Sequence, residues 1–330
     1  MLASAPLAQQ LYESAERLLG QPVKKVSPAG SGANSCLFRL ETAQGPVALK
    51  SYPARARDNR RRAEVEWQAL TFLHKHGLSA APTPIARDPT GQFLLMEWIE
   101  GTPVTTHGQD DIEDAARFIS EIFELSGDRD AVDFSLASEA CLSAAEILSQ
   151  IECRLTQFAA DPLIEAFLAE DFAPAIATVK NGVSEELANP SELERSKRRL
   201  IPADFGFHNA LRENGGMLRF VDFDYFGWDD PAKLTADFIL HPAMQLNADE
   251  THTFIDRMIA ALPEDKEFPG RLWRHIPLYA LRWALIMLNP FRSDRTDELP
   301  GDEAERGRLI DNRILKARAM AELAQSGIVF

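Results

Sequence analysis

The spacing of hydrophobic residues divides the chain into two parts with different periods. Up to about residue 100, short segments of alternating or β-branched apolar residues are separated by glycine-containing turns, which is typical of strands. The predicted strands span residues 22–27, 36–42, 47–51 and 92–98. The first three are expected to form an antiparallel meander, and apolar residues at helical spacing predict helices at 7–20 and 59–76.

From Gly101 onward, apolar residues recur mainly with the period of an α-helix. The helices predicted in this part span residues 112–125, 138–158, 163–179, 185–197, 232–244, 251–262, 272–288 and 303–324. The exception is the stretch 201–226, where segments 210–212 and 218–223 predict a hairpin. We therefore expect a small β-rich lobe over residues 1–97 and a larger, mostly helical lobe over residues 98–330.

Polar residues suited to metal binding and acid–base chemistry flank the hairpin. Asp204 and Asn209 precede it, and Asp222 lies on its predicted second strand. Because a hairpin places its flanks side by side, these three side chains can converge. Carboxylate and amide oxygens suit Mg²⁺, and a carboxylate free of the metal could accept a proton from a substrate hydroxyl. A structural alternative, with Asp204 capping a loop and Asn209 in a turn, also fits the pattern.

A second group of candidate residues lies in the β-rich part. The loop Gly30-Ser31-Gly32 joins the first two strands, and its backbone N–H groups could bind phosphate, although a plain hairpin turn would look the same. Lys50 ends the third strand, and a buried lysine needs a partner, which Glu64 or Glu66 on the next helix could provide. The apolar strand then runs through residues 94–101, a connector whose backbone could hold a flat base.

The order of these features resembles the protein-kinase-like fold, and most of all the aminoglycoside phosphotransferase and choline kinase family. The shared features are a glycine-rich loop, a strand lysine, a helix glutamate, an apolar connector, Asp-x4-Asn and an aspartate on a hairpin strand. The resemblance covers about residues 20–290, with its specific motifs in residues 30–101 and 201–237. It implies an α+β fold of two lobes, one a small antiparallel sheet and the other mostly helical.

The resemblance also implies a nucleotide site in the N-terminal lobe. Gly30-Ser31-Gly32 would cover the phosphates of ATP, and Lys50 would hold its α- and β-phosphates. Glu66 would pair with Lys50, in preference to Glu64, because residues 66–73 match the helix pattern of the family. The connector would supply the contacts to the base, with Met96 behind the adenine and the Glu97 carbonyl and Ile99 N–H facing it.

In the C-terminal lobe, the resemblance implies that Asp204 is the catalytic base and that Asn209 and Asp222 bind the metal. Residues 204–206 spell Asp-Phe-Gly, which marks the metal-binding aspartate of protein kinases. No Asp-x4-Asn lies about eighteen residues upstream, so we interpret this triplet as a coincidence. Asp230-Pro231 and Asp237 match a further family segment, in which the second aspartate braces the catalytic loop.

Four positions depart from the family pattern or extend it. Pro202 replaces a common histidine, and Gly206 stands where a basic side chain often neutralises the γ-phosphoryl group. His208 could take over that role, or could simply satisfy the backbone of its loop. Asp224 echoes an acidic residue of choline kinases and could bind a second metal or a cationic substrate, or be a solvated surface residue.

The net charge of −15 limits the expected partners. Nucleic acids and anionic membranes attract positive surfaces, so we expect neither. Three cysteines without paired spacing, no signal-peptide pattern and no apolar run longer than six residues predict a soluble cytoplasmic protein. Five aspartates fall within 27 residues around the proposed site, where metal ions or a cationic substrate would neutralise them: Asp204, Asp222, Asp224, Asp229 and Asp230.

Together these features predict an ATP- and Mg²⁺-dependent phosphotransferase that acts on a hydroxyl of a small molecule. A helix follows Asp222 too closely for a long peptide-docking segment, which disfavours a protein kinase. The acceptor stays open between an aminoglycoside, an amino alcohol and a sugar. Trp273, Tyr279 and Trp283 could line its pocket or belong to the core. Pro202 and Gly206 keep a nucleotide-binding pseudokinase with a regulatory role as the alternative.

Overall fold

The computed structural model describes residues 5–31, 35–52, 61–158, 160–295 and 299–326. The chain forms two compact units, each assembled from two separate stretches. The first unit comprises Met1–Ser138 with Leu200–Gly227, and the second comprises Glu139–Arg199 with Trp228–Phe330. The predicted lobe boundary at residue 97 stays a prediction.

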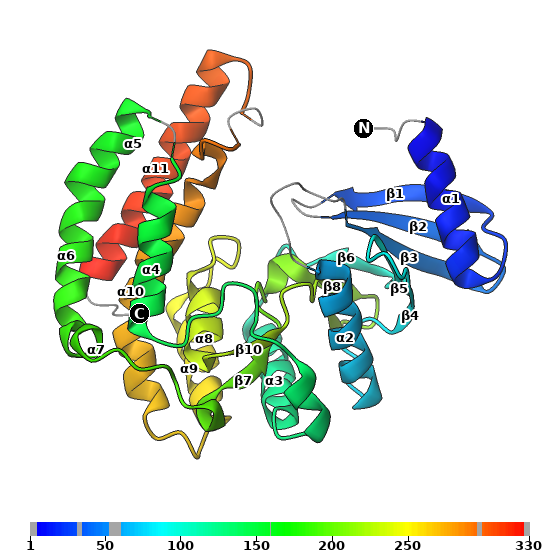
Figure 1. Cartoon of the computed structure of the whole chain (residues 1–330), viewed down its shortest axis with the longest axis horizontal. Helices are drawn as coiled ribbons and strands as arrows, with labels where there is room; N and C mark the ends of the chain where they lie inside the picture. The colour runs from blue at the N-terminus through cyan, green and yellow to red at the C-terminus, as the bar shows by residue number, and fades with distance from the viewer. Residues whose placement is uncertain (1–4, 32–34, 53–60, 159, 296–298, 327–330) are drawn as a thin grey trace. The chain divides into compact units, whose positions relative to one another are not determined.

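A five-stranded antiparallel sheet opens the first unit (Figure 1). Its strand order is β1-β2-β3-β5-β4, with β1 at Lys25–Ser31, β2 at Cys36–Thr42, β3 at Gly45–Ser51, β4 at Pro84–Arg87 and β5 at Phe93–Glu97. The predicted meander of the first three strands is confirmed. β1 begins at Lys25, later than the predicted start at residue 22, and β4 is missing from the prediction. Proline disfavours most strand positions, but Pro84 is tolerated as the first residue of an edge strand.

The two faces of this sheet are covered differently. Helix α1 (Ala5–Leu19) packs through Leu11 and Ala15 across one face (Figure 1). The strand residues that it covers are Phe38, Leu40, Leu49, Phe93 and Leu95. Because successive side chains of a strand point to opposite faces, Lys50 points away from α1. Helix α2 (Arg62–Lys75) contacts β4 and β5, while residues 59 and 60 of the predicted helix lie outside the described residues.

The rest of the first unit carries the predicted hairpin. Strand β8 (Ala210–Glu213) pairs with β9 (Leu218–Phe220) on one side and with β6 (Gly101–Pro103) on the other. The prediction that Asp222 lies on the second strand is wrong. β9 ends at Phe220, and Asp222 has a φ of 71°, which is incompatible with an extended strand. The other helical elements of this unit are α3 Gln109–Leu125, η1 Arg129–Asp133 and η4 Phe207–Asn209.

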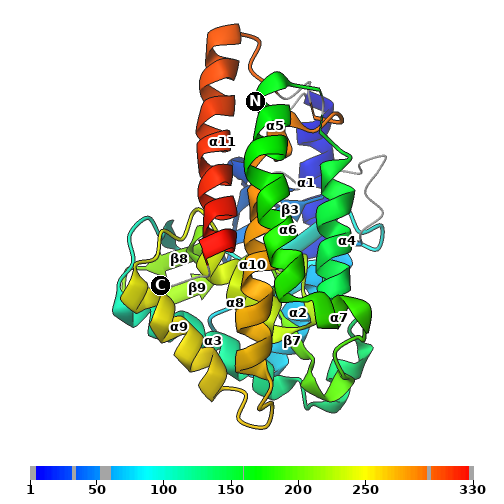
Figure 2. The ribbon, with the colours of Figure 1, turned by 90° about the vertical axis from the view of Figure 1, so that its left-hand side faces the viewer.

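The second unit is helical (Figure 2). Its long helix α10 contacts α4, α6, α8 and α11 and is buried along most of its length. The α-helices are α4 Ala144–Leu155, α5 Pro162–Phe167, α6 Ala173–Gly182, α7 Ser184–Ala188, α8 Pro231–Leu240, α9 Ala248–Ala260, α10 Phe268–Met287 and α11 Glu303–Ser326. The unit also contains a π-helical turn, η2 Leu168–Phe172, and two 3₁₀-helical turns, η3 Arg195–Lys197 and η5 Asn289–Phe291. The chain passes between the units three times: after Ser138, within β7 (Arg199–Ile201) and within β10 (Gly227–Asp229).

Several predicted helices differ from the structure at their ends; the helix predicted at 232–244, for example, ends at Leu240. The helix predicted at 185–197 is wrong beyond Ala188, where α7 ends, because Pro190 disfavours the helical conformation of the residue before it. The helix predicted at 138–158 begins only at Ala144, since the Ser143 hydroxyl caps its first turn by accepting a hydrogen bond from the Glu146 N–H. No helix of the described residues combines the length and the apolar character that crossing a bilayer requires.

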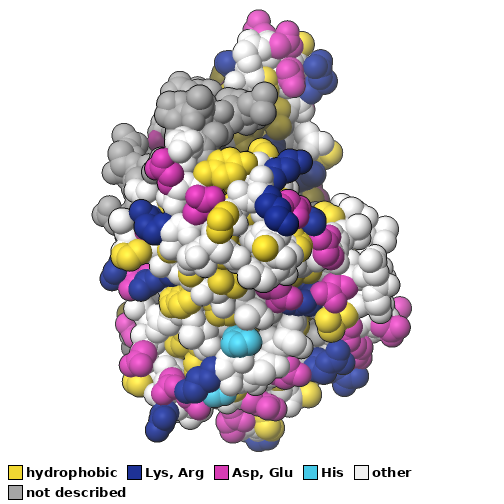
Figure 3. Space-filling view, turned by 90° about the vertical axis from the view of Figure 1, so that its right-hand side faces the viewer, with side chains coloured by type: hydrophobic (Ala, Val, Ile, Leu, Met, Phe, Trp, Pro, Cys, Tyr) yellow, Lys and Arg dark blue, Asp and Glu magenta, His cyan; other side chains and the backbone are white. Residues whose placement is uncertain are grey.

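The charged surface is mixed in sign on the face shown in Figure 3. Lys and Arg side chains lie there interspersed with Asp and Glu side chains and with single hydrophobic residues. Polyanion binding requires many clustered cations. This face shows no such cluster, but it is only one face of the molecule. The expectation that nucleic acid is not a partner therefore still depends on the acidic composition, with 50 Asp and Glu against 35 Lys and Arg.

Gly227 is a position at which a larger residue has no room. An added Cβ would lie 2.6 Å from two backbone atoms, Ala137 N and Ser135 O. Gly227→Ala should therefore lower the free energy of unfolding by about 2 kcal/mol or more, as overpacked sites do. Urea denaturation followed by circular dichroism measures this loss. Gly182→Ala is the control, because a Cβ at Gly182 meets no atom within 4 Å. Equal losses in the two variants would contradict the explanation.

Candidate active site

Lys50 and Glu66 form a buried ion pair. The Lys50 Nζ lies 2.6 Å from Glu66 Oε2, and both side chains are almost completely buried. Glu64 instead pairs with Arg61 and lies 3.5 Å from Arg87. Residues two apart on a helix point in different directions, so only one of the two glutamates can reach the sheet. The partner of Lys50 is therefore Glu66, the glutamate that matches the family pattern.

Two further groups bind the Glu66 carboxylate, and no sequence pattern predicts either of them. The Tyr52 hydroxyl donates a short hydrogen bond to Oε2, and the Phe223 N–H donates to Oε1 over 3.3 Å. Burial, followed by the charge of Glu66, raises the pKa of Tyr52 well above its ordinary value, so the phenol stays a donor. A buried carboxylate is costly unless its oxygens are hydrogen-bonded. Here the lysine, the phenol and the amide together satisfy it.

Lys50 also binds the aspartate that follows the hairpin. Its Nζ lies 2.6 Å from Asp222 Oδ1. Burial alone would lower the pKa of Lys50, but the charges of Glu66 and Asp222 raise it above its ordinary value. Burial alone would likewise raise the pKa of Asp222, but the Lys50 ammonium lowers it. Both groups are therefore charged at neutral pH, and the ammonium joins β3, α2 and the segment after β9.

Asn209 lies beside this aspartate because the backbone holds the two segments together. The Val221 N–H donates a hydrogen bond of 2.9 Å to the Asn209 carbonyl, directly after the β8–β9 pairing. The Asn209 side-chain Nδ2 donates to the Asp204 carbonyl over 2.9 Å. The side-chain oxygen of Asn209 is then the atom suited to a metal. Together with the Asp222 carboxylate it offers the hard oxygen donors that Mg²⁺ prefers.

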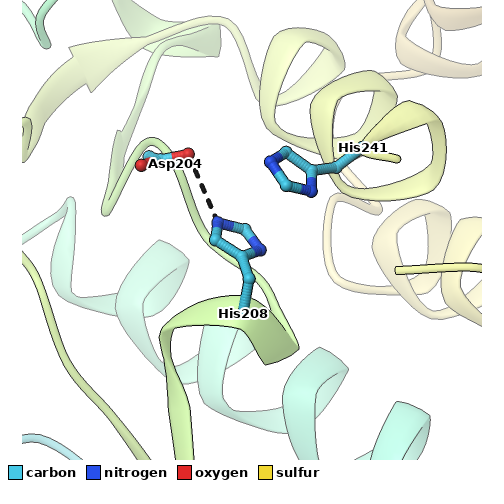
Figure 4. A group of neighbouring side chains, drawn as sticks. All are labelled: Asp204, His208 and His241. Atoms are coloured by element: carbon cyan, nitrogen blue, oxygen red, sulfur yellow. Dashed lines mark hydrogen bonds and ion pairs between the residues drawn. The ribbon is translucent and has the colours of Figure 1, made fainter. Parts of the chain in front are cut away.

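Asp204 occupies a strained turn before η4. Both Ala203 and Asp204 have positive φ values, 31° and 50°. Such residues cost free energy and persist where the surrounding structure enforces them, often at functional sites. The Asp204 side chain is 48% exposed, and His208 Nε2 lies 3.3 Å from its Oδ1 (Figure 4). His208 thus contacts the carboxylate proposed as the base, while the strained turn presents that carboxylate to solvent.

One of the alternatives for Asp224 was a solvated surface residue, and the structure excludes it because Asp224 is buried. Its side chain is 3% exposed, and Arg62 Nη1 donates to its Oδ2 over 2.8 Å. Burial, together with the neighbouring charge of Asp222, raises the pKa of Asp224, while Lys50 and Arg62 oppose this rise. Arg62 is absent from the residues that the sequence singled out, because the pair joins positions 162 apart in the chain.

The connector after β5 is fixed by the side chain of Glu97. Met96 is buried in β5 opposite Ala48 of β3, and Ile99 is also buried. The Glu97 carboxylate accepts hydrogen bonds from the Thr83 N–H at 3.0 Å and from Arg219 Nη2 at 2.8 Å. The Glu97 side chain therefore holds the connector in place. The part of Glu97 that is proposed to face a base is its backbone carbonyl.

Arg219 is, like Tyr52 and Arg62, a residue whose role no sequence pattern predicts. It is buried on β9 and binds Glu213 at 2.6 Å as well as Glu97 at 2.8 Å. The neighbouring Phe220 N–H donates to the Ala80 carbonyl over 2.8 Å. These contacts tie the hairpin to the end of β5 and to the segment before β4. The five-stranded sheet and the loops that carry Asp204 and Asp222 thus belong to one compact unit.

The glycine-rich loop is only partly described. Gly30 and Ser31 are the last residues of β1, paired with Leu37 and Cys36 of β2, and Gly32 lies outside the described residues. A Cβ at Gly30 would meet no atom within 4 Å. No atom of the described residues therefore crowds the backbone at Gly30.

The aspartates of the further family segment have structural partners in the helical unit. Asp230 caps α8 through the Ala232 N–H at 2.9 Å and pairs with Arg271 at 2.8 Å. Asp237 binds three groups: Lys233 at 2.7 Å, Arg282 at 3.3 Å and the Trp283 Nε1–H at 2.8 Å. These contacts tie α8 to α10.

Asp229, the other aspartate of this stretch, is fully buried. Its Oδ1 accepts a hydrogen bond of 2.9 Å from the Cys141 N–H, and burial raises its pKa to about 7. Among the late aromatic residues, Tyr279 is fully buried and belongs to the core, while Trp273 is 42% exposed. The packing of Tyr279 therefore favours the core alternative for that residue.

Solved structures with similar folds cover almost the whole chain. Spectinomycin phosphotransferase APH(9)-Ia, in complex with ADP and spectinomycin, is 14% identical with a TM-score of 0.61, over 96% of this chain and 98% of its own. Choline kinase LicA from Streptococcus pneumoniae is 14% identical with a TM-score of 0.61, over 96% and 100%. The streptomycin–ATP ternary complex of APH(2'')-IIa is 16% identical with a TM-score of 0.59, over 97% and 99%. The predicted protein-kinase-like fold is thereby confirmed.

Sequence comparisons give one family and no individual relative. No curated protein matches the chain. A family model described as the phosphotransferase enzyme family matches residues 25–271, about three quarters of the chain. The match spans the β1 strand, the Lys50–Glu66 pair, the hairpin with Asp204 and Asp222, and helices up to the start of α10. It confirms the prediction of an enzyme that transfers phosphoryl groups: the chain belongs to the phosphotransferase enzyme family.

Proposed function

We propose that the protein transfers the γ-phosphate of ATP, together with Mg²⁺, to a hydroxyl group of a small molecule. The observation that carries this proposal is the position of the Lys50 Nζ, 2.6 Å from both Glu66 and Asp222. It places a fixed cation beside a carboxylate suited to metal binding. Phosphoryl transfer depends chiefly on such positioning and on electrostatic stabilisation.

The nucleotide is proposed to lie against the sheet face that α1 leaves uncovered. Lys50 would bind its α- and β-phosphates, and the backbone N–H groups of residues 30–32 would approach the phosphates. Met96, the Glu97 carbonyl and the Ile99 N–H would contact the base. Support comes from the structural neighbours, one of which is described with ADP and another with ATP.

Mg²⁺ is proposed to bind the Asp222 carboxylate and the Asn209 side-chain oxygen. The donor set fits this ion, because both ligands are hard oxygens and Mg²⁺ usually keeps several waters beside few protein groups. When bound, the ion neutralises charge on the phosphates of the nucleotide. Lys50 keeps Asp222 ionised and oriented for this purpose.

Asp204 is proposed to act as the base. Its exposed carboxylate would accept the proton of the acceptor hydroxyl as the acceptor oxygen forms a bond to the γ-phosphorus. The bond from that phosphorus to the bridging oxygen breaks, and ADP leaves with its electron pair. His208, 3.3 Å from the carboxylate, would hold it in place in the turn. The departures Pro202 and Gly206 remove helper groups without altering this carboxylate.

The acceptor is proposed to be a small molecule. Only a few residues separate Asp222 from β10 and α8, so the chain has no long segment there for docking a peptide. The neighbours act on or bind spectinomycin, streptomycin or choline according to their descriptions. We therefore propose an aminoglycoside, an amino alcohol or a sugar. Three free cysteines agree with work in the reducing cytoplasm.

A coupled ATP-consumption assay over these three classes of hydroxyl compound, with and without Mg²⁺, tests the proposal. We expect one class to accelerate ADP formation only when Mg²⁺ is present. Mg²⁺-dependent nucleotide binding that no acceptor accelerates would instead favour a regulatory pseudokinase, the function that Pro202 and Gly206 keep open. Absence of nucleotide binding would overturn both functions.

Replacing the proposed base separates catalysis from binding. Asp204→Asn should lower kcat by about 100-fold or more, because a positioned general base contributes that much, while the Kd for Mg-ATP changes little. Steady-state kinetics and isothermal titration calorimetry measure the two quantities. Asp249→Asn, at an exposed position on α9, is the control. Comparable turnover in Asp204→Asn and the wild type would remove Asp204 from the mechanism.

The two glutamates of α2 provide a matched test of the lysine pair. Glu66→Gln keeps the shape of the side chain but removes the charge bound to Lys50, and should weaken Mg-ATP binding by about tenfold or more. Glu64→Gln, two residues away on the same helix, should change the Kd less than about twofold, because this half-buried carboxylate pairs with the exposed Arg61 and not with Lys50. Nucleotide titrations of both variants measure this. Equal effects would show that Lys50 does not need its buried partner.

Removal of the proposed metal ligand should appear as a changed Mg²⁺ requirement. Asp222→Asn should raise the Mg²⁺ concentration for half-maximal rate by about tenfold or more, because it removes the anionic ligand of the ion. The rate is measured against Mg²⁺ at saturating ATP. An unchanged Mg²⁺ response would exclude Asp222 as a ligand.

A further inference from the structure

We propose that Arg62 is a positioning residue for the metal-binding segment, and that it acts through Asp224. This inference rests on the proposed function, since it assigns a role within the same site. Arg62 supplies permanently the positive charge that a second metal or a cationic acceptor would otherwise bring to Asp224. Asp224 is then the internal partner of an arginine and not a ligand for substrate.

The contact geometry is that of a buried, well-oriented pair. Arg62 is 5% exposed and Asp224 is 3% exposed, with 2.8 Å between Nη1 and Oδ2. Arg62 Nη2 donates to the Tyr225 hydroxyl over 3.0 Å, and the guanidinium lies 4.7 Å from the centroid of that ring. A guanidinium held by a carboxylate, a phenol and an aromatic face has little freedom to turn.

The same face of α2 carries both anchors of the segment after β9. Arg62 and Glu66 are four residues apart and therefore lie next to each other on the helix surface. Glu66 binds the Phe223 N–H and, through Lys50, Asp222. Arg62 binds the next two residues, Asp224 and Tyr225. Helix α2 thus contacts three consecutive positions, 223–225, directly, and reaches Asp222 only through Lys50 of β3.

These two sets of contacts stabilise the strained backbone conformation of Asp222. Its φ of 71° is costly for a residue with a side chain, and such a conformation persists only where neighbouring contacts enforce it. Lys50 fixes the carboxylate of Asp222, but the backbone on its C-terminal side is held through Phe223 and Asp224. Loss of Arg62 would release that side and misplace the carboxylate that is proposed to bind Mg²⁺.

The number of charged groups around Asp222 also supports a role for Arg62 as the partner of Asp224. The described cluster contains the carboxylates of Glu66, Asp222 and Asp224 and the cations Lys50 and Arg62. One additional cation site, at Asp222, is consistent with this set. Without Arg62, the buried Asp224 carboxylate would lose its direct ion pair while Asp222 remains nearby, and breaking a buried pair is strongly unfavourable.

A double-mutant cycle distinguishes an internal partner from an independent ligand. The proteins compared are the wild type, Arg62→Gln, Asp224→Asn and the double variant, each checked by circular dichroism and thermal melting. Each single variant should raise the Mg²⁺ concentration for half-maximal ADP binding and lower kcat by about tenfold. The double variant should be no worse than the worse single one. This corresponds to a coupling of about tenfold, or about 1.4 kcal/mol.

Arg61→Gln is the matched control, because Arg61 precedes Arg62 on the same helix start and is 78% exposed. It should leave the Mg²⁺ response and kcat unchanged. If Arg62→Gln does not fold, Arg62→Lys replaces it in the same cycle. Lysine keeps the charge but cannot make both contacts of the guanidinium, and a coupling of about fivefold is expected.

Two outcomes would overturn the inference. Multiplicative effects in the double variant would mean that Asp224 binds metal or acceptor by itself. Losses of thermal stability without any change in the Mg²⁺ response would mean that Arg62 has a merely structural role. Failure of the proposed function is separate, because it would appear in the wild type as the absence of Mg²⁺-dependent nucleotide binding or of acceptor-dependent turnover.

Discussion

Burial of the Lys50 ammonium is the constraint on which the first unit depends. An ammonium removed from water must be matched by charge, and the match comes from two elements far apart in the chain, α2 and the segment after β9. Each contributes one carboxylate at 2.6 Å. Removing one partner of such a buried group costs several kcal/mol. The strand, the helix and the loop after the hairpin are therefore fixed together by a single nitrogen atom.

The parts of this arrangement that the sequence predicts are those with a local pattern. The strand ending in Lys50, the helix glutamate and the Asp-x4-Asn before a hairpin can be recognised by spacing and turn signals. Tyr52, Arg62 and Arg219 could not be assigned roles in this way, because their partners are decided by tertiary packing. The wrong prediction of helix beyond Ala188 has a different cause. Pro190 is a local signal for the end of the helix, but the prediction gave more weight to the helical spacing of the apolar residues.

Strain and compensation lie close together in the same unit. Ala203, Asp204 and Asp222 all adopt left-handed backbone conformations, which few non-glycine residues do. The turn at Asp204 is closed by the Asn209 amide, and the turn at Asp222 is held by Lys50 and by the contacts of α2. The proposed base and the proposed metal ligand are thus oriented by backbone geometry that the polar network maintains. Stability is given up locally for orientation.

The contacts of Arg219 have a consequence for motion. The buried Arg219 of β9 joins the hairpin to the end of β5 through Glu97, while Glu213 of β8 binds the same guanidinium within the hairpin. Amide hydrogens in β5 and in β9 should then exchange with solvent as one cooperative group, since opening either strand breaks the Arg219–Glu97 ion pair. The sheet proposed to bind the nucleotide would thus open together with the loops proposed to carry the base and the metal.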